Sequence, residues 1–237
     1  MHGCVAVTAV TVQDSLRVSG FVEMPPATVA DQVRVVVADI GVGAAKTGML
    51  ASAPIIVAVA DVCDEVGLGA SVPLVVDPVA ASMHGDPLLA ESALDALRTL
   101  LFPRATLVTP NLDEVRLLVG VDVRSRAEQY HAARALHALG PRWVLVKGGH
   151  LRTDPDCVDL LFDGTTFTEL TGPRLPTPHT HGGGDTLAAA ITSHLAQGRP
   201  VPDAVAFGKW YVQEAVAHAY PLGAGVGPVS PFWRLAP

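Results

Sequence analysis

The sequence predicts a doubly wound α/β fold, in which a mainly parallel β-sheet is covered by helices on both faces. Short apolar runs typical of buried strands alternate with helical patterns along most of the 237 residues. Hydrophobic residues make up 49% of the chain and charged residues 16%, as expected when both faces of a parallel sheet are buried. No internal repeat or low-complexity linker divides the chain, so we expect one domain over residues 1–237.

The N-terminal part predicts two extended segments followed by a helix. Residues 4–12 form an apolar run that predicts a buried strand, and residues 18–23 form a second extended run. Pro25 and Pro26 then open a helix to about residue 38, because proline is tolerated in the first helical turn.

Strands and helices then alternate. Apolar runs predict strands, polar or proline residues start helices, and glycines such as Gly67 and Gly140 end them. In chain order we expect a strand at 44–49, a helix capped by Ser52 to residue 66, a strand at 72–78, a loop at 79–86 and a helix at 88–101. A strand at 105–109, a helix opened by residues 110–114, a helix at 125–139 and a strand at 143–147 follow.

The C-terminal third predicts a hairpin and two helices. Residues 156–170 form the hairpin, with Asp163-Gly164 as its turn. A helix follows the glycine triplet at 182–184, and a last helix covers residues 202–220.

Composition excludes several functional classes. The net charge is −7 without a cluster of Lys or Arg, which argues against a nucleic-acid surface. The apolar run at 55–62 is short and interrupted by acids, and no basic segment suited to a signal peptide opens the chain, so we expect no membrane partner. Cys4, Cys63 and Cys157 are too far apart for a zinc site or a disulfide framework, which suits the cytoplasm.

The glycine triplet indicates a phosphate site. Gly182, Gly183 and Gly184 let backbone N–H groups approach an anion, and the helix that follows adds the positive end of its dipole. Asp185 comes next and is our candidate for the base that accepts a proton from an attacking hydroxyl. The alternative is a flexible loop in which Asp185 serves as the helix N-cap.

Polar residues at other strand ends are expected to gather around this triplet. In such sheets ligands bind beyond the carboxyl ends of the strands. By this rule we expect the triplet to lie close to the following residues: Gln13, Met49, Asp77, Asn111 and Lys147.

Each of these strand-end candidates has an alternative structural explanation. Asp77 is suited to a bound cation but equally to capping the turn before Pro78. Asn111 and Glu114 offer oxygen ligands for Mg²⁺ and its waters beside ATP, or else form a capping pair. Lys147 is placed to reach phosphates, or is a solubilising lysine at a strand end.

Several motifs occur together in a fixed order along the chain. They are Asp77-Pro78, Thr109-Pro110-Asn111-Leu112-x-Glu114, Val146-Lys147-Gly148-Gly149-His150 and the glycine triplet, with further matches in Val5-x-Val7-Thr8-Ala9 and Gln13, Lys46-x-Gly48-Met49-Leu50, Gly85-Asp86-Pro87-Leu88-Leu89 and Gly225-x-Gly227-Pro228-Val229. This set resembles the ribokinase superfamily over essentially the whole chain. The resemblance is strongest to its hydroxymethylpyrimidine/phosphomethylpyrimidine kinase branch, which serves thiamine biosynthesis.

The resemblance implies a ribokinase-like fold and an activity. The enzyme would transfer the γ-phosphoryl group of ATP to the hydroxymethyl group of the aminopyrimidine alcohol and then phosphorylate the monophosphate to the diphosphate. Homodimers are implied as well. Site residues carried over are the following: Gln13, Met49 and Val79 for the pyrimidine, Asn111, Lys147 and Gly149 for the nucleotide, Asp77 and Glu114 for Mg²⁺, and the glycine triplet for the transferring phosphate.

Two departures from the family pattern affect these expectations. The family usually has Cys where this chain has Asp185, whereas sugar kinases of the superfamily have Asp. Family members also begin with a strand and a glycine-rich segment before the point that corresponds to His2, so one strand–helix unit of roughly thirty residues is expected to be absent. The alternatives are therefore a pyridoxal kinase or a catalytically silent ligand-binding fold.

Overall fold

A computed structural model describes residues 1–80, 89–149, 151 and 156–235. Residues 81–86 of the predicted loop, Leu88 at the predicted start of a helix, and His150 lie outside the described residues. In the described part, the strands form one sheet of six strands and one of two strands.

The six-stranded sheet is the centre of the fold. Its strands lie across the sheet in chain order: β3 (Ala45–Thr47), β4 (Leu74–Val76), β5 (Leu107–Val108), β6 (Trp143–Val146), β7 (Asp156–Phe162) and β8 (Phe167–Pro173). Strands β3 to β6 pair in parallel, and β7 runs antiparallel to both β6 and β8. The predicted mainly parallel sheet and the predicted hairpin are both confirmed, and β3 forms one edge.

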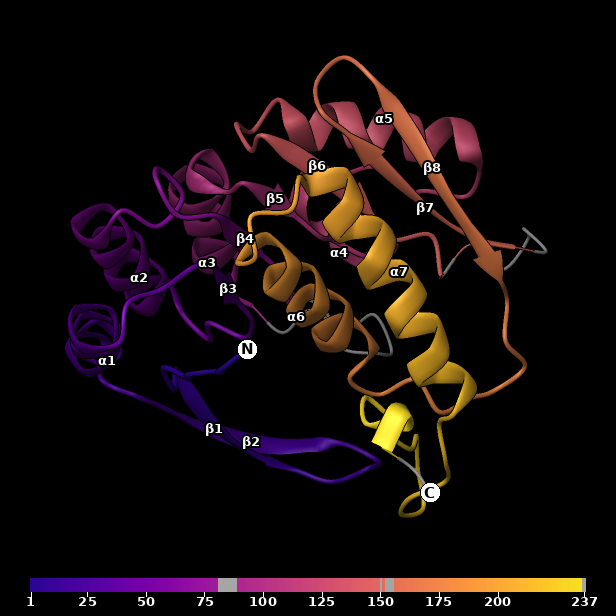
Figure 1. Cartoon of the computed structure of the whole chain (residues 1–237), viewed down its shortest axis with the longest axis horizontal. Coiled ribbons are helices and arrows are strands. Elements are labelled where there is room, and N and C mark those ends of the chain that lie inside the picture. The colour runs from indigo at the N-terminus through magenta and orange to yellow at the C-terminus, as the bar shows by residue number, and fades with distance from the viewer. Residues whose placement is uncertain (81–88, 150, 152–155, 236–237) are drawn as a thin grey trace.

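Helices cover both faces of this sheet, as predicted (Figure 1). On one face the sheet packs against α2 (Ala53–Val66), α3 (Glu91–Ala96), α4 (Leu112–Val119) and α5 (Arg126–His137), and α1 (Pro26–Asp39) packs against α2. On the other face lie α6 (Gly183–Leu195) and α7 (Val201–Ala217). Successive strand residues point to opposite faces, so Leu74 and Val76 join the larger core while Val75 joins the core under α6 and α7.

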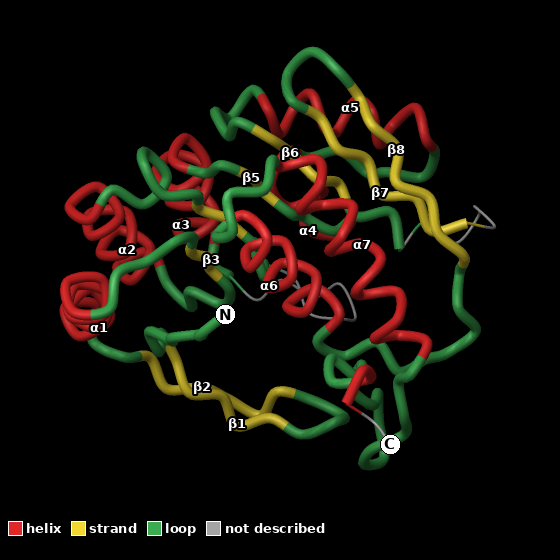
Figure 2. Tube along the Cα trace, in the orientation of Figure 1, coloured by secondary structure: helices red, strands yellow, loops and turns green. Residues whose placement is uncertain are grey.

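The N-terminal strands form a separate ribbon. β1 (Ala9–Gln13) and β2 (Val18–Glu23) pair antiparallel with each other and lie away from the main sheet, as the tube in Figure 2 shows. The prediction of a buried strand at residues 4–12 is therefore wrong: β1 starts at Ala9 and most of its residues are exposed. An apolar run indicates a strand but does not identify its partner, and here the next segment of chain is the partner.

The ribbon is attached at both of its ends. Near the body of the protein, the Thr8 hydroxyl donates to the Met49 carbonyl at 2.6 Å. At the tip, the Gly225 amide donates to the Ser15 hydroxyl at 3.1 Å. Between these points Val10 and Val12 remain 56% and 62% exposed, so the ribbon contributes little to the core.

Helix boundaries were predictable except around one proline. Gly67 has a positive φ of 79° directly after α2, and Gly140, with a positive φ of 104°, lies three residues after the end of α5. The helix predicted over 88–101 is α3 followed by a π-helical turn (Leu97–Leu101) and a 3₁₀ turn (Phe102–Arg104). Pro103 lacks an N–H donor, which accounts for the change in hydrogen bonding as the segment ends.

The structure also bears on membranes and thiols. None of the helices in the described residues combines the length and apolar character that a membrane span requires. Cys4, Cys63 and Cys157 are free thiols. A short 3₁₀ helix (Trp233–Leu235), which the sequence did not predict, follows near the C-terminus.

Candidate active site

Three parallel strands deliver the central polar residues of the site. Asp77 follows β4, Asn111 lies three residues after β5, and Lys147 follows β6 directly. Asn111 and Lys147 form an isolated parallel bridge, and the Lys147 amide donates to the Pro110 carbonyl at 2.9 Å. The carboxyl ends of β4, β5 and β6 therefore meet at one edge, which is why these distant residues become neighbours.

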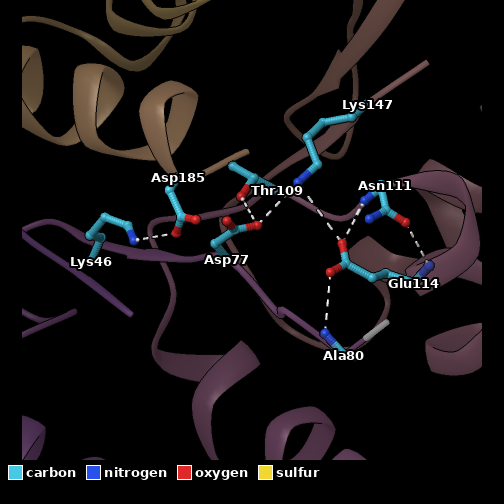
Figure 3. Close-up of polar contacts among 8 residues, drawn as sticks. All are labelled: Lys46, Asp77, Ala80, Thr109, Asn111, Glu114, Lys147 and Asp185. Atoms are coloured by element: carbon cyan, nitrogen blue, oxygen red, sulfur yellow. Dashed lines mark hydrogen bonds and ion pairs between the residues drawn. The ribbon is translucent and has the colours of Figure 1, made fainter. Parts of the chain in front are cut away.

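Lys147 is held between two acids. Its ammonium lies 3.1 Å from Asp77 Oδ1 and 3.9 Å from Glu114 Oε2. The side chains of Lys147, Asp77 and Glu114 are 15%, 4% and 3% exposed, so the group is almost fully buried. The Thr109 hydroxyl donates a further hydrogen bond of 3.0 Å to Asp77 Oδ1, and Figure 3 shows the whole network.

Burial and charge shift two pKa values in this network. Burial raises the pKa of the Glu114 carboxyl; Lys147 opposes this effect, and the charge of Asp77 adds to it. Burial alone would lower the pKa of Lys147, but the attraction of Asp77 and Glu114 outweighs it and the pKa is raised. Lys147 therefore remains a cation at neutral pH, as a phosphate ligand must.

The alternative interpretation of Asn111 and Glu114 as a capping pair is confirmed. The Asn111 side chain accepts from the Glu114 amide at 2.9 Å, and Glu114 Oε2 accepts from the Asn111 amide at 2.7 Å, which is a capping box at the start of α4. Glu114 Oε1 also accepts from the Ala80 amide at 3.2 Å. Both Glu114 oxygens thus have partners in this structure, and one partner is the residue next to Val79.

The glycine triplet forms the start of α6. Gly182 is the N-cap with a positive φ of 79°, and Gly183 and Gly184 already belong to the helix, so the loop alternative is wrong. No side chain caps this helix. The Gly183 amide donates to the Thr180 carbonyl at 3.1 Å, and the other N–H groups of the first turn can approach an anion. A Cβ built on Gly184 would lie 3.4 Å from Lys147 Nζ and 3.7 Å from Asp77 Oδ2, so Gly184 faces the buried network.

Asp185 is not the N-cap of α6. It lies in the first turn, its side chain is 69% exposed, and its Oδ1 is 3.4 Å from Lys46 Nζ. Figure 3 shows Asp185 and Lys46 side by side, with Asp77 next to them. The acid is thus accessible to an incoming molecule while its neighbour Gly184 contacts the buried network.

Lys46 is a site residue that sequence reasoning missed. It lies in β3, its side chain is 24% exposed, and a Cβ on Gly48 would lie 3.3 Å from its ammonium. The motif Lys46-x-Gly48-Met49-Leu50 was visible in the sequence, but nothing local connects it with Asp185, which is 139 residues away. The fold places Lys46 beside Asp185, the proposed base.

The residues expected to contact the pyrimidine are less closely grouped. Met49 follows β3 and is partly buried against the core, and Val79 follows Asp77 with a strained positive φ of 44°. Strain of this kind in a β-branched residue tends to occur at functional sites. Gln13 is exposed at the end of β1 in the separate ribbon, so the strand-end rule does not place it with the others, and its role remains a prediction.

Comparison with known proteins identifies the family of this chain. The model of the family described as phosphomethylpyrimidine kinase matches residues 1–230. The chain belongs to the phosphomethylpyrimidine kinase family. A hydroxymethylpyrimidine/phosphomethylpyrimidine kinase of Mycobacterium tuberculosis is 61% identical over 236 residues, which cover 100% of this chain and 85% of that protein.

Solved structures of kinases have the same fold as this phosphomethylpyrimidine kinase family member. An ADP complex of Bacillus subtilis pyridoxal kinase superposes with a TM-score of 0.88 at 33% identity, over 98% of this chain and 87% of that one. A phosphomethylpyrimidine kinase of Clostridium difficile gives a TM-score of 0.77 at 31% identity, over 91% of this chain and 87% of that one. The backbone alone thus does not separate the two vitamin kinases, whereas the 61% identity favours the pyrimidine enzymes.

Proposed function

We propose that this protein is an ATP-dependent kinase that phosphorylates 4-amino-5-hydroxymethyl-2-methylpyrimidine and then its monophosphate, giving the diphosphate used in thiamine biosynthesis. The observation that carries the proposal is the uncapped start of α6, where Gly184 faces Lys147 and Asp77 while Asp185 remains accessible. Family membership and the relative of 61% identity support the substrate. We assign the activity to a single domain over residues 1–237.

Each of these residues has its own role in the proposed phosphoryl transfer. Backbone N–H groups of the Gly182–Gly184 turn hold the transferring phosphoryl group, and Lys147 balances its charge. The oxygen of the substrate hydroxyl bonds to the γ-phosphorus while the bond from the γ-phosphorus to ADP breaks. Asp185 accepts the proton that this hydroxyl loses. Lys46, at 3.4 Å, orients Asp185 before the substrate arrives.

The nucleotide is proposed to lie over Asn111, Lys147 and Gly149. Asn111 and Lys147 are joined by a backbone bridge, and Gly149 lies two residues further along the same loop. The ADP-bound pyridoxal kinase with a TM-score of 0.88 supports nucleotide binding by this architecture.

The acid pair of the site fits a magnesium ion. Asp77 and Glu114 supply buried carboxylate oxygens, the donor type that Mg²⁺ prefers. Among the described residues no group of three or more metal-binding side chains occurs, and Mg²⁺ usually completes its shell with water and phosphate. When bound, the ion would neutralise charge on the ATP phosphates, and Asp77 and Glu114 would hold it.

The pyrimidine is proposed to bind beside Met49 and Val79, with Gln13 reaching it from the ribbon. Met49 offers an apolar wall and Gln13 both a donor and an acceptor for a ring edge. The strained backbone at Val79, one residue before the Ala80 amide that Glu114 fixes, supports a shaped pocket at this position.

Turnover of two alcohols tests the proposed function. The purified chain is given ATP and Mg²⁺ with either the hydroxymethylpyrimidine or pyridoxal, and kcat/KM is measured for each. We expect the pyrimidine to be preferred; a preference for pyridoxal would favour the alternative that the structural neighbours represent. A chain that binds ADP in calorimetry but turns over neither alcohol, even when extended at its N-terminus by the in-frame upstream sequence, would support the silent alternative.

We also propose a cytoplasmic homodimer. The three free thiols suit a reducing compartment, and the exposed apolar side chains of the ribbon, including Val12, Phe21 and Val22, suit burial against a second copy. Light scattering should give twice the mass of one chain. The mass of a single chain at all concentrations would contradict the dimer.

A further inference from the structure

A buried ion pair lies under the proposed nucleotide loop. Lys209 projects from α7 into the protein and its ammonium is 2.8 Å from Asp159 Oδ2 on β7. Both side chains are 7% exposed. Burying two charges costs more solvation energy than a typical pair returns, so stability alone is a weak explanation for this arrangement.

A hydrogen bond connects the pair to the nucleotide loop. Asp159 Oδ1 accepts from the Gly148 amide at 2.8 Å, and Gly148 lies between Lys147 and Gly149. Lys209 also donates to the Cys157 carbonyl at 3.0 Å, so two residues of β7 fix the position of its ammonium. The carboxylate therefore joins helix α7 to the backbone that carries the phosphate-binding lysine.

The loop is packed so closely that no side chain fits at Gly148. A Cβ at Gly148 would lie 1.9 Å from the Val158 carbonyl oxygen. The Gln129 amide group bridges the carbonyls of Val146 and Val158 at 3.1 and 3.0 Å. Arg174 donates to the Gly149 carbonyl at 2.7 Å on the other side.

We propose that Lys209 and Asp159 form a positioning pair for nucleotide binding. Lys209 orients the Asp159 carboxylate, and this carboxylate accepts from the Gly148 amide, which sets the backbone at Lys147 and Gly149. The proposal rests on the proposed function, because it assumes that this loop binds the phosphates of ATP. Neither residue touches the substrate.

Three variants separate positioning from stability. Asp159→Asn weakens the charge-assisted hydrogen bond to Gly148. Lys209→Met leaves a buried carboxylate without its counter-ion and lowers stability strongly. The double variant Lys209→Met with Asp159→Leu removes both charges, so it should be more stable than Lys209→Met alone, yet it leaves the Gly148 amide without its acceptor.

Binding of ADP by calorimetry is the first measurement, and KM for ATP against KM for the alcohol is the second. We expect Asp159→Asn and the double variant to bind ADP about tenfold more weakly and to raise KM for ATP to a similar extent, with KM for the alcohol unchanged. Val205→Ala is the matched control: Val205 is fully buried in α7, so this change lowers the melting temperature without touching the loop.

The outcomes are distinct. If the double variant binds ADP as tightly as the unmodified protein, or if Val205→Ala weakens ADP binding as much as the pair variants do, the positioning role is overturned. If the unmodified protein does not bind ADP, the proposed function fails and the positioning role fails with it.

Discussion

Replacing Asp185 with asparagine is expected to lower kcat for phosphorylation of the pyrimidine alcohol by about 10²- to 10⁴-fold, the usual contribution of a positioned general base. Asparagine has the size of aspartate but cannot take the substrate proton at neutral pH. Because the side chain is 69% exposed, the free energy of unfolding should change by less than about 0.5 kcal/mol. Steady-state turnover measures kcat, urea unfolding measures the free energy of unfolding, and calorimetry measures the binding of ADP.

Asp203 provides the control for this experiment. Like Asp185, it is an exposed acid in the first turn of a helix, α7, so Asp203→Asn removes the same favourable charge from a helix N-terminus. Its kcat should equal that of the unmodified protein. A loss of less than about tenfold in Asp185→Asn would exclude Asp185 as the base.

Replacing Lys147 with methionine is expected to destabilise the protein by about 3–5 kcal/mol, because it leaves buried carboxylates without their counter-ion. Asp77 and Glu114 are only 4% and 3% exposed, so water cannot replace the ammonium. Nucleotide binding should be lost as well, since the proposed phosphate ligand is gone. Urea unfolding measures the first effect and ADP calorimetry the second.

The double variant Lys147→Met with Asp77→Asn tests the cause of the instability. Asp77 accepts at 3.1 Å from Lys147, so removing both charges should cost less than the sum of the two single changes. Additive losses would mean that the pair does not interact in the folded protein. The control is Arg124→Met, which breaks an ion pair with Asp122 whose side chains are 80% and 54% exposed and should cost about 1 kcal/mol or less.

The helices and the polar strand ends were predictable because their signals are local. Asn111 and Glu114 are three residues apart and form the capping box that their spacing indicates. Asp77 and Lys147 each follow an apolar run, and the rule that ligands bind at the carboxyl ends of parallel strands brings them together. These features required no knowledge of which strands pair.

The wrong or missed predictions concern strands and side chains whose partners cannot be identified from the local sequence. The apolar run at residues 4–12 predicted a buried strand, but β1 pairs with β2 alone and leaves Val10 exposed. The same uncertainty affects Gln13, whose expected place depended on β1 lying in the main sheet. Lys46 and Lys209 were missed because each meets its acid through the fold, at separations of 139 and 50 residues.

The order of the strands has a consequence for how the site comes into being. Since β3 to β8 lie across the sheet in chain order, a chain emerging from the ribosome can add each strand beside the previous one. The Asp77–Lys147 contact becomes possible once β6 has been synthesised, but the Lys46–Asp185 contact must await α6. A nascent chain that has assembled most of its sheet thus still lacks its proposed proton acceptor, and the capacity for catalysis arises late in synthesis.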